Sequence, residues 1–317
     1  FVSAFTLRRA LGLYQGFDVY NGGEKANRDG DVTVSDFGSW LNVQEGPVFT
    51  WVHFFDVHGP LGRWAQPKDR KQRWERDPER LPHIPMYQRI ANITDARLFR
   101  TLYARSVEFA DEQVGAVVEI LKKKGRYDDT LVIVVADHGE SFEERELWYD
   151  HGNSPHAEQT QIPMIVKLPK NKNAGTEDTR LASLLDVAPT ALSVAGLSPL
   201  PNISGKPLNV EGEGHTTLYA ESSHCKRIKV LDCAPVGAKG KETAVRDKQY
   251  ALFSKPKEAG VETELFDRSA DRWELTPSQA QVPQDLSESL AIIQAERRER
   301  TYGPLPDVRN PQDEDLQ

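Results

Sequence analysis

The sequence predicts an α/β fold: a mostly parallel central sheet with helices on both faces, and a small C-terminal antiparallel sheet with one helix. Two observations lead to this fold class. Through the first two thirds of the chain, short apolar segments alternate with segments of helical period, which is typical of parallel strands joined by helices. After about Gly212 the apolar segments become short and alternating, as in antiparallel strands.

The first predicted strand and a long helix come early in the chain. Residues 47–55 are rich in β-branched and aromatic side chains, which favour a strand. Between 95 and 124, apolar residues recur at intervals of three and four, which predicts one long amphipathic helix. Thr94 or Asp95 would cap this helix, and Gly125 would end it after a basic last turn.

Two further strands and a helix follow. Residues 131–136 begin with consecutive apolar side chains, as expected of a strand buried on both faces. Residues 162–168 form a second short apolar segment, which predicts another buried strand. Residues 181–195 have a helical composition, with an interruption expected near Pro189 and an end at Gly196.

The chain is expected to divide into an α/β domain at 1–212 and a small α+β subdomain at 213–302. The subdomain strands are separated by Gly, Pro and Lys, and a charged helix at about 284–301 follows them. The remaining residues, 303–317, are rich in proline and acids and are predicted to be a strap or a disordered tail. The strands are expected at 216–221, 227–232, 243–247, 250–254 and 262–266.

Composition excludes some classes of function. The 317 residues carry a formal net charge of −8, so no nucleic-acid partner is expected, because a basic face for phosphates is lacking. No apolar run is long enough to cross a bilayer, so no membrane span is expected. Because the chain begins at Phe1, we expect a mature or excised piece. Cys225 and Cys233 are compatible with a disulfide or with free thiols.

Polar residues follow two of the predicted strands directly. Asp137 and His138 come after the 131–136 strand, and Asp56 and His58 follow the earlier one. Ligands of open α/β sheets sit at the carboxyl ends of strands, where loops place polar groups on a rigid support. An Asp followed by a His can present an oxygen and a nitrogen to one divalent cation, and the glycine after them lets the backbone turn.

A further imidazole lies downstream in the motif Asp150-His151-Gly152. Together these groups would form a site for an anion bound next to a metal. Each also has a plainer interpretation: the Asp-His-Gly motif as a turn with a solvated histidine, His58 as a hydrogen-bonded core or rim histidine, and Asp56 as a cap of the segment that follows it. The acids Glu140, Glu143 and Glu144 are interpreted as a solvated acidic loop.

Several segments resemble, in order, a sulfatase of the alkaline phosphatase superfamily. They are YDDTLVIVVADHGESFEE, WYDHGNSPHAEQTQIPMIVKLP, LASLLDVAPTALSVAGL and PNISGKPL, preceded by GLYQGFDVYNG, VHFFDVHGP and YARSVEFADEQVGAVVEIL and followed by ETAVRDKQYALF and TELFDRSAD. The resemblance covers about residues 1–275. It implies the alkaline phosphatase-like α/β fold and hydrolysis of a sulfate ester by a metal-assisted covalent mechanism.

The resemblance assigns roles to four residues. Asp137 and His138 match metal ligands of the family, most often for Ca²⁺, with Mn²⁺ as the alternative. His151 matches a residue that contacts the anion or assists the leaving group, and His58 matches a histidine that contacts sulfate or phosphate oxygens. Where the family usually has a tyrosine after this histidine, the chain has Leu61.

The nucleophile of the family is not in this sequence. The family carries a Cys/Ser-x-Pro-x-Arg segment whose cysteine becomes formylglycine, and paired aspartates on an N-terminal strand, and neither occurs here. We therefore expect the complete protein to supply them, and the chain alone to be inactive, to bind metal weakly and to expose apolar edges near 48–55 and 131–136. The missing segment or a second subunit is the expected partner that covers these edges.

Other functions remain open. The alternatives are a phosphonate or phosphate ester hydrolase, a phosphoethanolamine transferase, or a non-catalytic fragment acting as a binding module. The expected substrate is a small sulfate ester or a sulfated sugar, and the expected location is periplasmic, secreted or lysosomal rather than cytoplasmic. Candidate residues for the rim of the pocket are Arg63, Trp64, Trp148 and His224.

Overall fold

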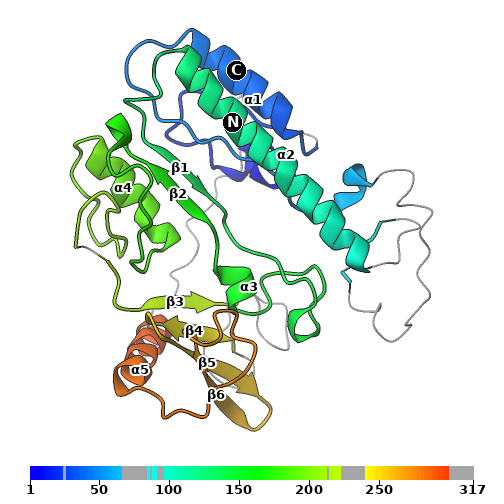
Figure 1. Cartoon of the computed structure of the whole chain (residues 1–317), viewed down its shortest axis with the longest axis vertical. Coiled ribbons are helices and arrows are strands. Elements are labelled where there is room, and N and C mark those ends of the chain that lie inside the picture. Colours follow the sequence, from blue (N-terminus) through cyan, green and yellow to red (C-terminus); the bar gives the residue numbers. More distant parts are fainter. Residues whose placement is uncertain are drawn as a thin grey trace. The chain divides into compact units, whose positions relative to one another are not determined.

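The computed structural model describes residues 1–23, 26–65, 84–85, 88–90, 96–212, 214–222 and 240–299. The chain forms two compact units, Phe1–Asp129 and Thr130–Pro306, which are described separately below (Figure 1). The domain boundary expected after residue 212 stays a prediction. In the described part of the chain, no helix is both long and apolar enough to cross a membrane.

The first unit is built on two helices, α1 (Gly30–Asn42) and α2 (Ala96–Lys123), which pack against each other (Figure 1). Helix α2 confirms the long helix predicted at 95–124, and Gly125 follows it with a φ of 66°. Helix α1 has no counterpart in the sequence prediction. The unit also contains short 3₁₀ turns at Phe5–Leu7, Arg9–Leu11 and Leu61–Trp64.

The strand predicted at 47–55 is wrong. The segment is extended, but among the described residues its ladder pairing is limited to one isolated bridge between His53 and Val2. The backbone N–H of His53 donates to the carbonyl of Phe1 at 2.8 Å. A strand needs a neighbour along its length to pair its N–H and C=O groups, and no strand of the described residues lies beside this segment. Its side chains Val48, Phe49 and Trp51 are exposed.

The second unit begins with two strands, β1 (Val132–Val135) and β2 (Met164–Lys167), which confirm the strands predicted at 131–136 and 162–168. They pair antiparallel, with Val132 opposite Lys167 and Val135 opposite Met164. The sheet that the described residues form here is therefore antiparallel, and the parallel strands predicted for the central sheet are not among them.

Short helices lie between these two strands and after them along the chain. They are Glu144–Glu146, α3 (Ala157–Thr160), Pro169–Asn171, Leu184–Asp186 and α4 (Val187–Val194). The helix predicted at 181–195 is interrupted before Pro189, because α4 begins only at Val187. Pro189 lies in the first turn of α4, where a backbone N–H would make no hydrogen bond within the helix, so proline is tolerated there. Gly196 ends the helix with a φ of 69°, as predicted.

A four-stranded antiparallel sheet completes the second unit (Figure 1). Its strands, in spatial order, are β3 (Leu218–Glu221), β4 (Thr243–Arg246), β5 (Tyr250–Lys257) and β6 (Gly260–Asp267), and α5 (Gln284–Glu299) covers it. Val245, Leu252 and Leu265 of the sheet pack with Leu286 and Leu290 of the helix. This confirms the predicted antiparallel sheet with one helix. The predictions for 227–232, for 303–317 and for both cysteines fall outside the described residues.

Candidate functional site at the end of strand β1

Asp137 and His138 follow β1 directly, as the sequence predicted, and Gly139 then brings the chain against another segment. The N–H of Gly139 donates to the carbonyl of Gln159 at 2.9 Å. A Cβ at position 139 would collide with the backbone carbonyl of Glu158. The glycine is therefore required for close approach of two backbones, which differs from the turn that the sequence suggested.

Asp137 and His138 contact each other through backbone and side chain. The N–H of His138 donates to Asp137 Oδ1 at 2.9 Å, while Asp137 Oδ2 lies 3.6 Å from His138 Nε2. His138 Nδ1 lies 2.8 Å from the carbonyl oxygen of Gly139, so the neutral ring carries its proton on Nδ1 and its lone pair on Nε2. The Asp137 side chain is 83% exposed, which leaves its oxygens open to a ligand.

The loop after Gly139 returns His151 to His138. Ser141 and Asp150 form an isolated antiparallel bridge, and the N–H of Tyr149 donates to the carbonyl of Ser141 at 2.7 Å. This closed loop places the His151 ring on the His138 ring, with centroids 4.3 Å apart and an angle of 26° between the planes. Three predicted site residues, Asp137, His138 and His151, therefore lie together.

Glu140 holds the ring of His151. His151 Nδ1 lies 3.4 Å from both carboxylate oxygens of Glu140, and Asp150 Oδ1 accepts the backbone N–H of His151 at 3.0 Å. The contact with Glu140 raises the pKa of His151, although burial acts in the opposite direction. The interpretation of Glu140 as a solvated residue is wrong, because its side chain is only 13% exposed and faces an imidazole.

Asp137, His138 and His151 line a cleft of about 1270 Å³ within the second unit. Its volume exceeds the range of about 300–1,000 Å³ that is usual for small-molecule sites, so it has room for more than a single sulfate group. Charged residues of both signs line it. The basic ones are Lys172, Arg180, Arg246 and Arg268, and the acidic ones include Glu177, Asp178, Glu211, Glu221 and Glu274.

The site fits part of a divalent-cation centre. Two ligand atoms held about 2.3 Å from one cation can be 3.6 Å apart, which is the distance between Asp137 Oδ2 and His138 Nε2. Within the described ranges there is no group of three or more His, Cys, Asp or Glu residues that could hold a metal. Hard cations take about six to eight ligands, so this pair leaves most of the coordination to groups elsewhere.

His58 and Asp56 belong to the first unit and are placed by contacts within it. His58 Nδ1 lies 2.6 Å from the Gly59 carbonyl oxygen, and its ring stacks on Phe55 with centroids 4.3 Å apart. Asp56 is buried, and its Oδ1 accepts the N–H of Gly30 at 3.1 Å, so it caps helix α1. Burial raises the pKa of Asp56. The role of His58 toward the substrate stays a prediction.

Two residues proposed for the rim hold the same turn of the first unit. Arg63 pairs with Asp56 at 3.1 Å and with Asp29, and the indole N–H of Trp64 donates to the carbonyl of Asp56 at 3.2 Å. These contacts give Arg63 and Trp64 a structural role in the first unit that does not require a substrate. His224, the last of the rim candidates, lies outside the described residues.

Comparison with known proteins finds sulfatases. Arylsulfatase K of Mus musculus is 26% identical over 186 residues, which is 58% of this chain and 33% of that protein. The N-acetylglucosamine-6-O-sulfatase of Bacteroides thetaiotaomicron is 31% identical over 116 residues, 36% of this chain and 20% of that protein. The chain thus spans about a third or less of the length of these two relatives.

Solved structures share the fold. A 2-O GAG sulfatase matches 84% of this chain and 61% of its own with a TM-score of 0.60 at 20% identity. The phosphonate monoester hydrolase of Silicibacter pomeroyi matches 85% of this chain and 59% of its own with a TM-score of 0.61 at 17% identity. The sulfatase family model matches residues 13–197, more than half of the chain. The chain belongs to the sulfatase family of the alkaline phosphatase superfamily.

Proposed function

We propose that the complete protein is a sulfuric ester hydrolase, and that the end of β1 forms half of its active site. One observation carries the proposal: the His138 and His151 rings stack at 4.3 Å beside Asp137, within the segment that matches the sulfatase family. The nucleophile, for which formylglycine is the expectation, and the remaining metal ligands would come from parts of the protein outside this sequence. Those parts would also add parallel strands to the central sheet.

Asp137 and His138 would hold a divalent cation through Asp137 Oδ2 and His138 Nε2. Carboxylate oxygen favours Ca²⁺, and the imidazole makes Mn²⁺ the alternative. When bound, the cation would stabilise negative charge on the oxygens of the transferred sulfate group. The hydrogen bond between His138 Nδ1 and the Gly139 carbonyl supports this role, because it keeps the lone pair on Nε2.

His151 would protonate the leaving alcohol. Its Nδ1 faces Glu140 at 3.4 Å, and this carboxylate raises the pKa of the ring, so the acid form persists to higher pH. His151 also lines the cleft, where a substrate oxygen can reach it. His58 is proposed to contact the sulfate oxygens.

The proposed substrate is a sulfated sugar or small sulfate ester. The cleft of about 1270 Å³ is large enough for a sugar ring, and two of the proteins similar to this chain are named as an N-acetylglucosamine-6-O-sulfatase and a 2-O GAG sulfatase. A periplasmic, secreted or lysosomal location remains part of the proposal.

A phosphonate ester hydrolase is the second candidate, because the Silicibacter pomeroyi enzyme shares the fold with a TM-score of 0.61. The test assays the complete protein on aryl sulfate, alkyl sulfate and phosphonate monoester substrates. We expect the highest kcat/KM on a sulfate ester and loss of turnover in Asp137→Ala. A clear preference for the phosphonate would replace the proposal with its rival, and no turnover of any of them would favour a binding module.

A further inference from the structure

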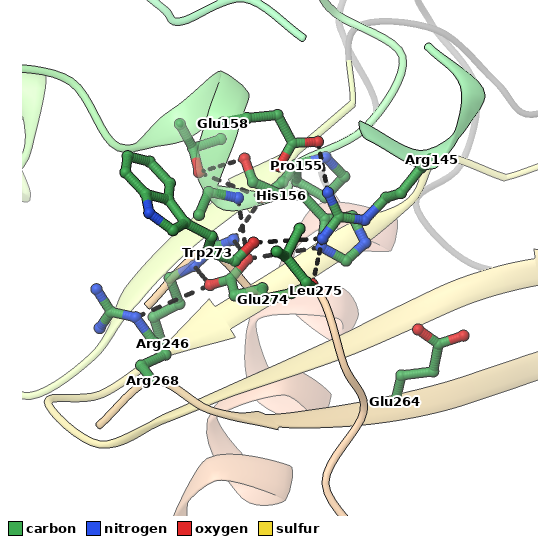
Figure 2. A network of polar contacts seen from close by, with 12 residues as sticks. Arg145, Pro155, His156, Glu158, Arg246, Glu264, Arg268, Trp273, Glu274 and Leu275 are labelled. Carbon is green, nitrogen blue, oxygen red and sulfur yellow. Dashed lines mark hydrogen bonds and ion pairs between the residues drawn. The ribbon is translucent and has the colours of Figure 1, made fainter. Parts of the chain in front are cut away.

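A buried carboxylate near the C-terminal sheet contacts the segment around Pro155 and His156, as Figure 2 shows, and this segment follows His151 in the chain. Glu274, which follows β6, has a fully buried side chain. Its Oε2 accepts the N–H of Ala157, the first residue of α3, at 3.0 Å. Arg246 of β4 donates to both oxygens of Glu274 at 2.6 and 2.7 Å and to the carbonyl of Pro155 at 2.5 Å. The pair therefore binds the backbone at two positions just after His151.

The residue between these two anchors is packed into the same sheet. The His156 ring stacks on Phe253 of β5, with centroids 4.0 Å apart and 17° between the planes. It also meets Phe266 of β6 edge-on at 5.4 Å. The segment that leaves His151 is thus fixed by backbone hydrogen bonds and by ring packing together.

Arg145 ties the other side of the loop to the same carboxylate residue. Its guanidinium donates to Glu158 Oε1 at 2.7 Å and to the backbone carbonyls of Glu274 and Trp273. The residues Arg145, Tyr149 and Glu274 all have positive φ, at 54°, 52° and 58°. A positive φ costs free energy in any residue other than glycine, and such residues keep it only where contacts with the surrounding structure hold the backbone in that conformation. The loop is therefore held in one shape by its contacts.

The Arg246–Glu274 pair is charged although it is buried. Burial by itself would raise the pKa of Glu274, but hydrogen bonds with Arg246 and His156, together with the charge of Arg246, outweigh it and lower the pKa to about 2. Arg268 adds a second cation, with its Nε 3.8 Å from Glu274 Oε1. Removing the carboxylate charge would leave a buried arginine without its main partner, so the anchor depends on both members.

We propose that the Arg246–Glu274 pair is a positioning element for His151: it fixes the backbone at 155 and 157 and so keeps the His151 ring against His138. The pair acts through the loop, so its residues are positioning residues and not catalytic ones. For its effect on turnover the proposal rests on the role proposed above for His151. For its effect on the loop it stands on the contacts alone.

The first test is structural and uses the complete protein. Hydrogen–deuterium exchange is measured for peptides covering 139–158 in the parent, in Glu274→Gln and in Glu264→Gln. Glu264 pairs with Lys255 at 2.6 Å on the same sheet, so Glu264→Gln removes a carboxylate charge from an ion pair without touching the loop. We expect faster exchange at 139–158 only in Glu274→Gln. Equal exchange in all three proteins would overturn the proposal.

The second test is kinetic and compares alkyl and aryl sulfates. We expect Glu274→Gln to lower kcat on the alkyl sulfate by about 10- to 100-fold more than on the aryl sulfate, with KM little changed, because a displaced acid matters most for a poor leaving group. Equal losses on both esters, or a rise in KM alone, would overturn the positioning role. A parent protein without sulfatase activity would refute the proposed function, while the exchange test still decides the anchor.

Arg246→Lys provides a second variant in case Glu274→Gln fails to fold. Lysine keeps the charge but loses the planar fork that binds Glu274 twice and Pro155 once. We expect the same changes in exchange and in leaving-group dependence, smaller in size. A variant that folds with parent-like exchange at 139–158 and parent-like kinetics would count against the proposal.

Discussion

His138 and His151 stack their rings at a centroid distance of 4.3 Å, although the 139–150 loop separates them in the sequence. The stack exists because the loop closes on itself at Ser141 and Asp150. It brings a nitrogen suited to a metal and an imidazole suited to proton transfer into one cleft. The following predictions test what this arrangement does.

Asp137→Asn should weaken binding of divalent metal to the complete protein. The substitution removes the charge of a proposed oxygen ligand, whose exposed position would give a cation direct access. Titration calorimetry with Ca²⁺ and Mn²⁺ measures the change. Asp178→Asn is the control, because Asp178 lines the same cleft but is paired with Arg180. Equal affinities in the parent and Asp137→Asn would remove this residue from the metal site.

Glu140→Gln should move the alkaline limb of the pH–rate profile to lower pH. In the parent, Glu140 raises the pKa of His151, so the ring stays protonated, and able to act as an acid, to higher pH. Loss of the carboxylate charge lets that pKa fall toward its ordinary value. The measurement is kcat against pH on an alkyl sulfate. An unchanged alkaline limb would show that His151 is not the acid that limits the rate.

His151→Gln should slow hydrolysis of an alkyl sulfate more than that of an aryl sulfate. Loss of a positioned acid costs about 10²–10⁴ in rate, and an activated phenolic leaving group needs little of this help. Parallel steady-state assays on the two esters measure the difference. If both rates fall by the same factor, His151 serves in anion binding instead of proton transfer.

His156→Phe should make the folded protein less sensitive to acid. Burial lowers the pKa of His156 to about 4 from 6.5, so between these values the unfolded chain binds a proton that the folded chain excludes. The free energy of unfolding therefore includes a contribution from the neutral ring that is fully present above pH 6.5. This contribution, on the order of 3 kcal/mol, is lost as the pH drops toward 4. Phenylalanine keeps the ring packing and does not titrate.

Urea unfolding of the parent and His156→Phe between pH 7 and 5 measures this difference. The window lies above the range in which Glu274 takes up its proton, because its pKa is lowered from 4.5 to about 2. The parent should lose stability across this window faster than the variant. Parallel slopes would mean that His156 does not govern the acid response.

Gly139→Ala should destabilise the protein and displace the site residues. A methyl group there meets the carbonyl of Glu158 and forces apart the backbones that join Gly139 to Gln159. Thermal unfolding measures the effect. Gly115→Ala is the matched control. Among the described residues nothing lies within 4 Å of a Cβ added at position 115, and alanine in the interior of a helix such as α2 is more stabilising than glycine by about 0.5–1 kcal/mol. The two variants should therefore shift Tm in opposite directions.

The sequence predicted elements where local pattern decides structure. The 28 residues of α2 carry a clear helical period, and the strands β4, β5 and β6 are short segments with polar turn residues between them. The candidate residues Asp137, His138 and His151, which the structure brings together, stand out in the sequence because they sit in short motifs next to a strand or a glycine. Helix α1 was missed, although Val34, Phe37 and Leu41 lie at helical spacing, because its glycines and serines weaken the pattern.

Other features depend on contacts that no local pattern encodes. The 47–55 segment has strand composition but no strand beside it in the described chain, so propensity alone gave the wrong structure. Glu140 was interpreted as solvated because its neighbours Glu143 and Glu144 are acidic, yet the loop folds it onto His151. Glu274 gave no signal at all, since its partner Arg246 is distant in the sequence.

The distance along the chain between the loop and its anchor has a consequence for biosynthesis. Pro155 and Arg246 are 91 positions apart, and Ala157 and Glu274 are 117 apart. A ribosome therefore completes Asp137, His138 and His151 long before it makes the residues that hold them, and closing so large a loop is slow. Until Glu274 has emerged, the nascent chain carries the side chains of the site and the closure at Ser141 and Asp150 without the proposed anchor, so a message truncated before that codon yields a product without it.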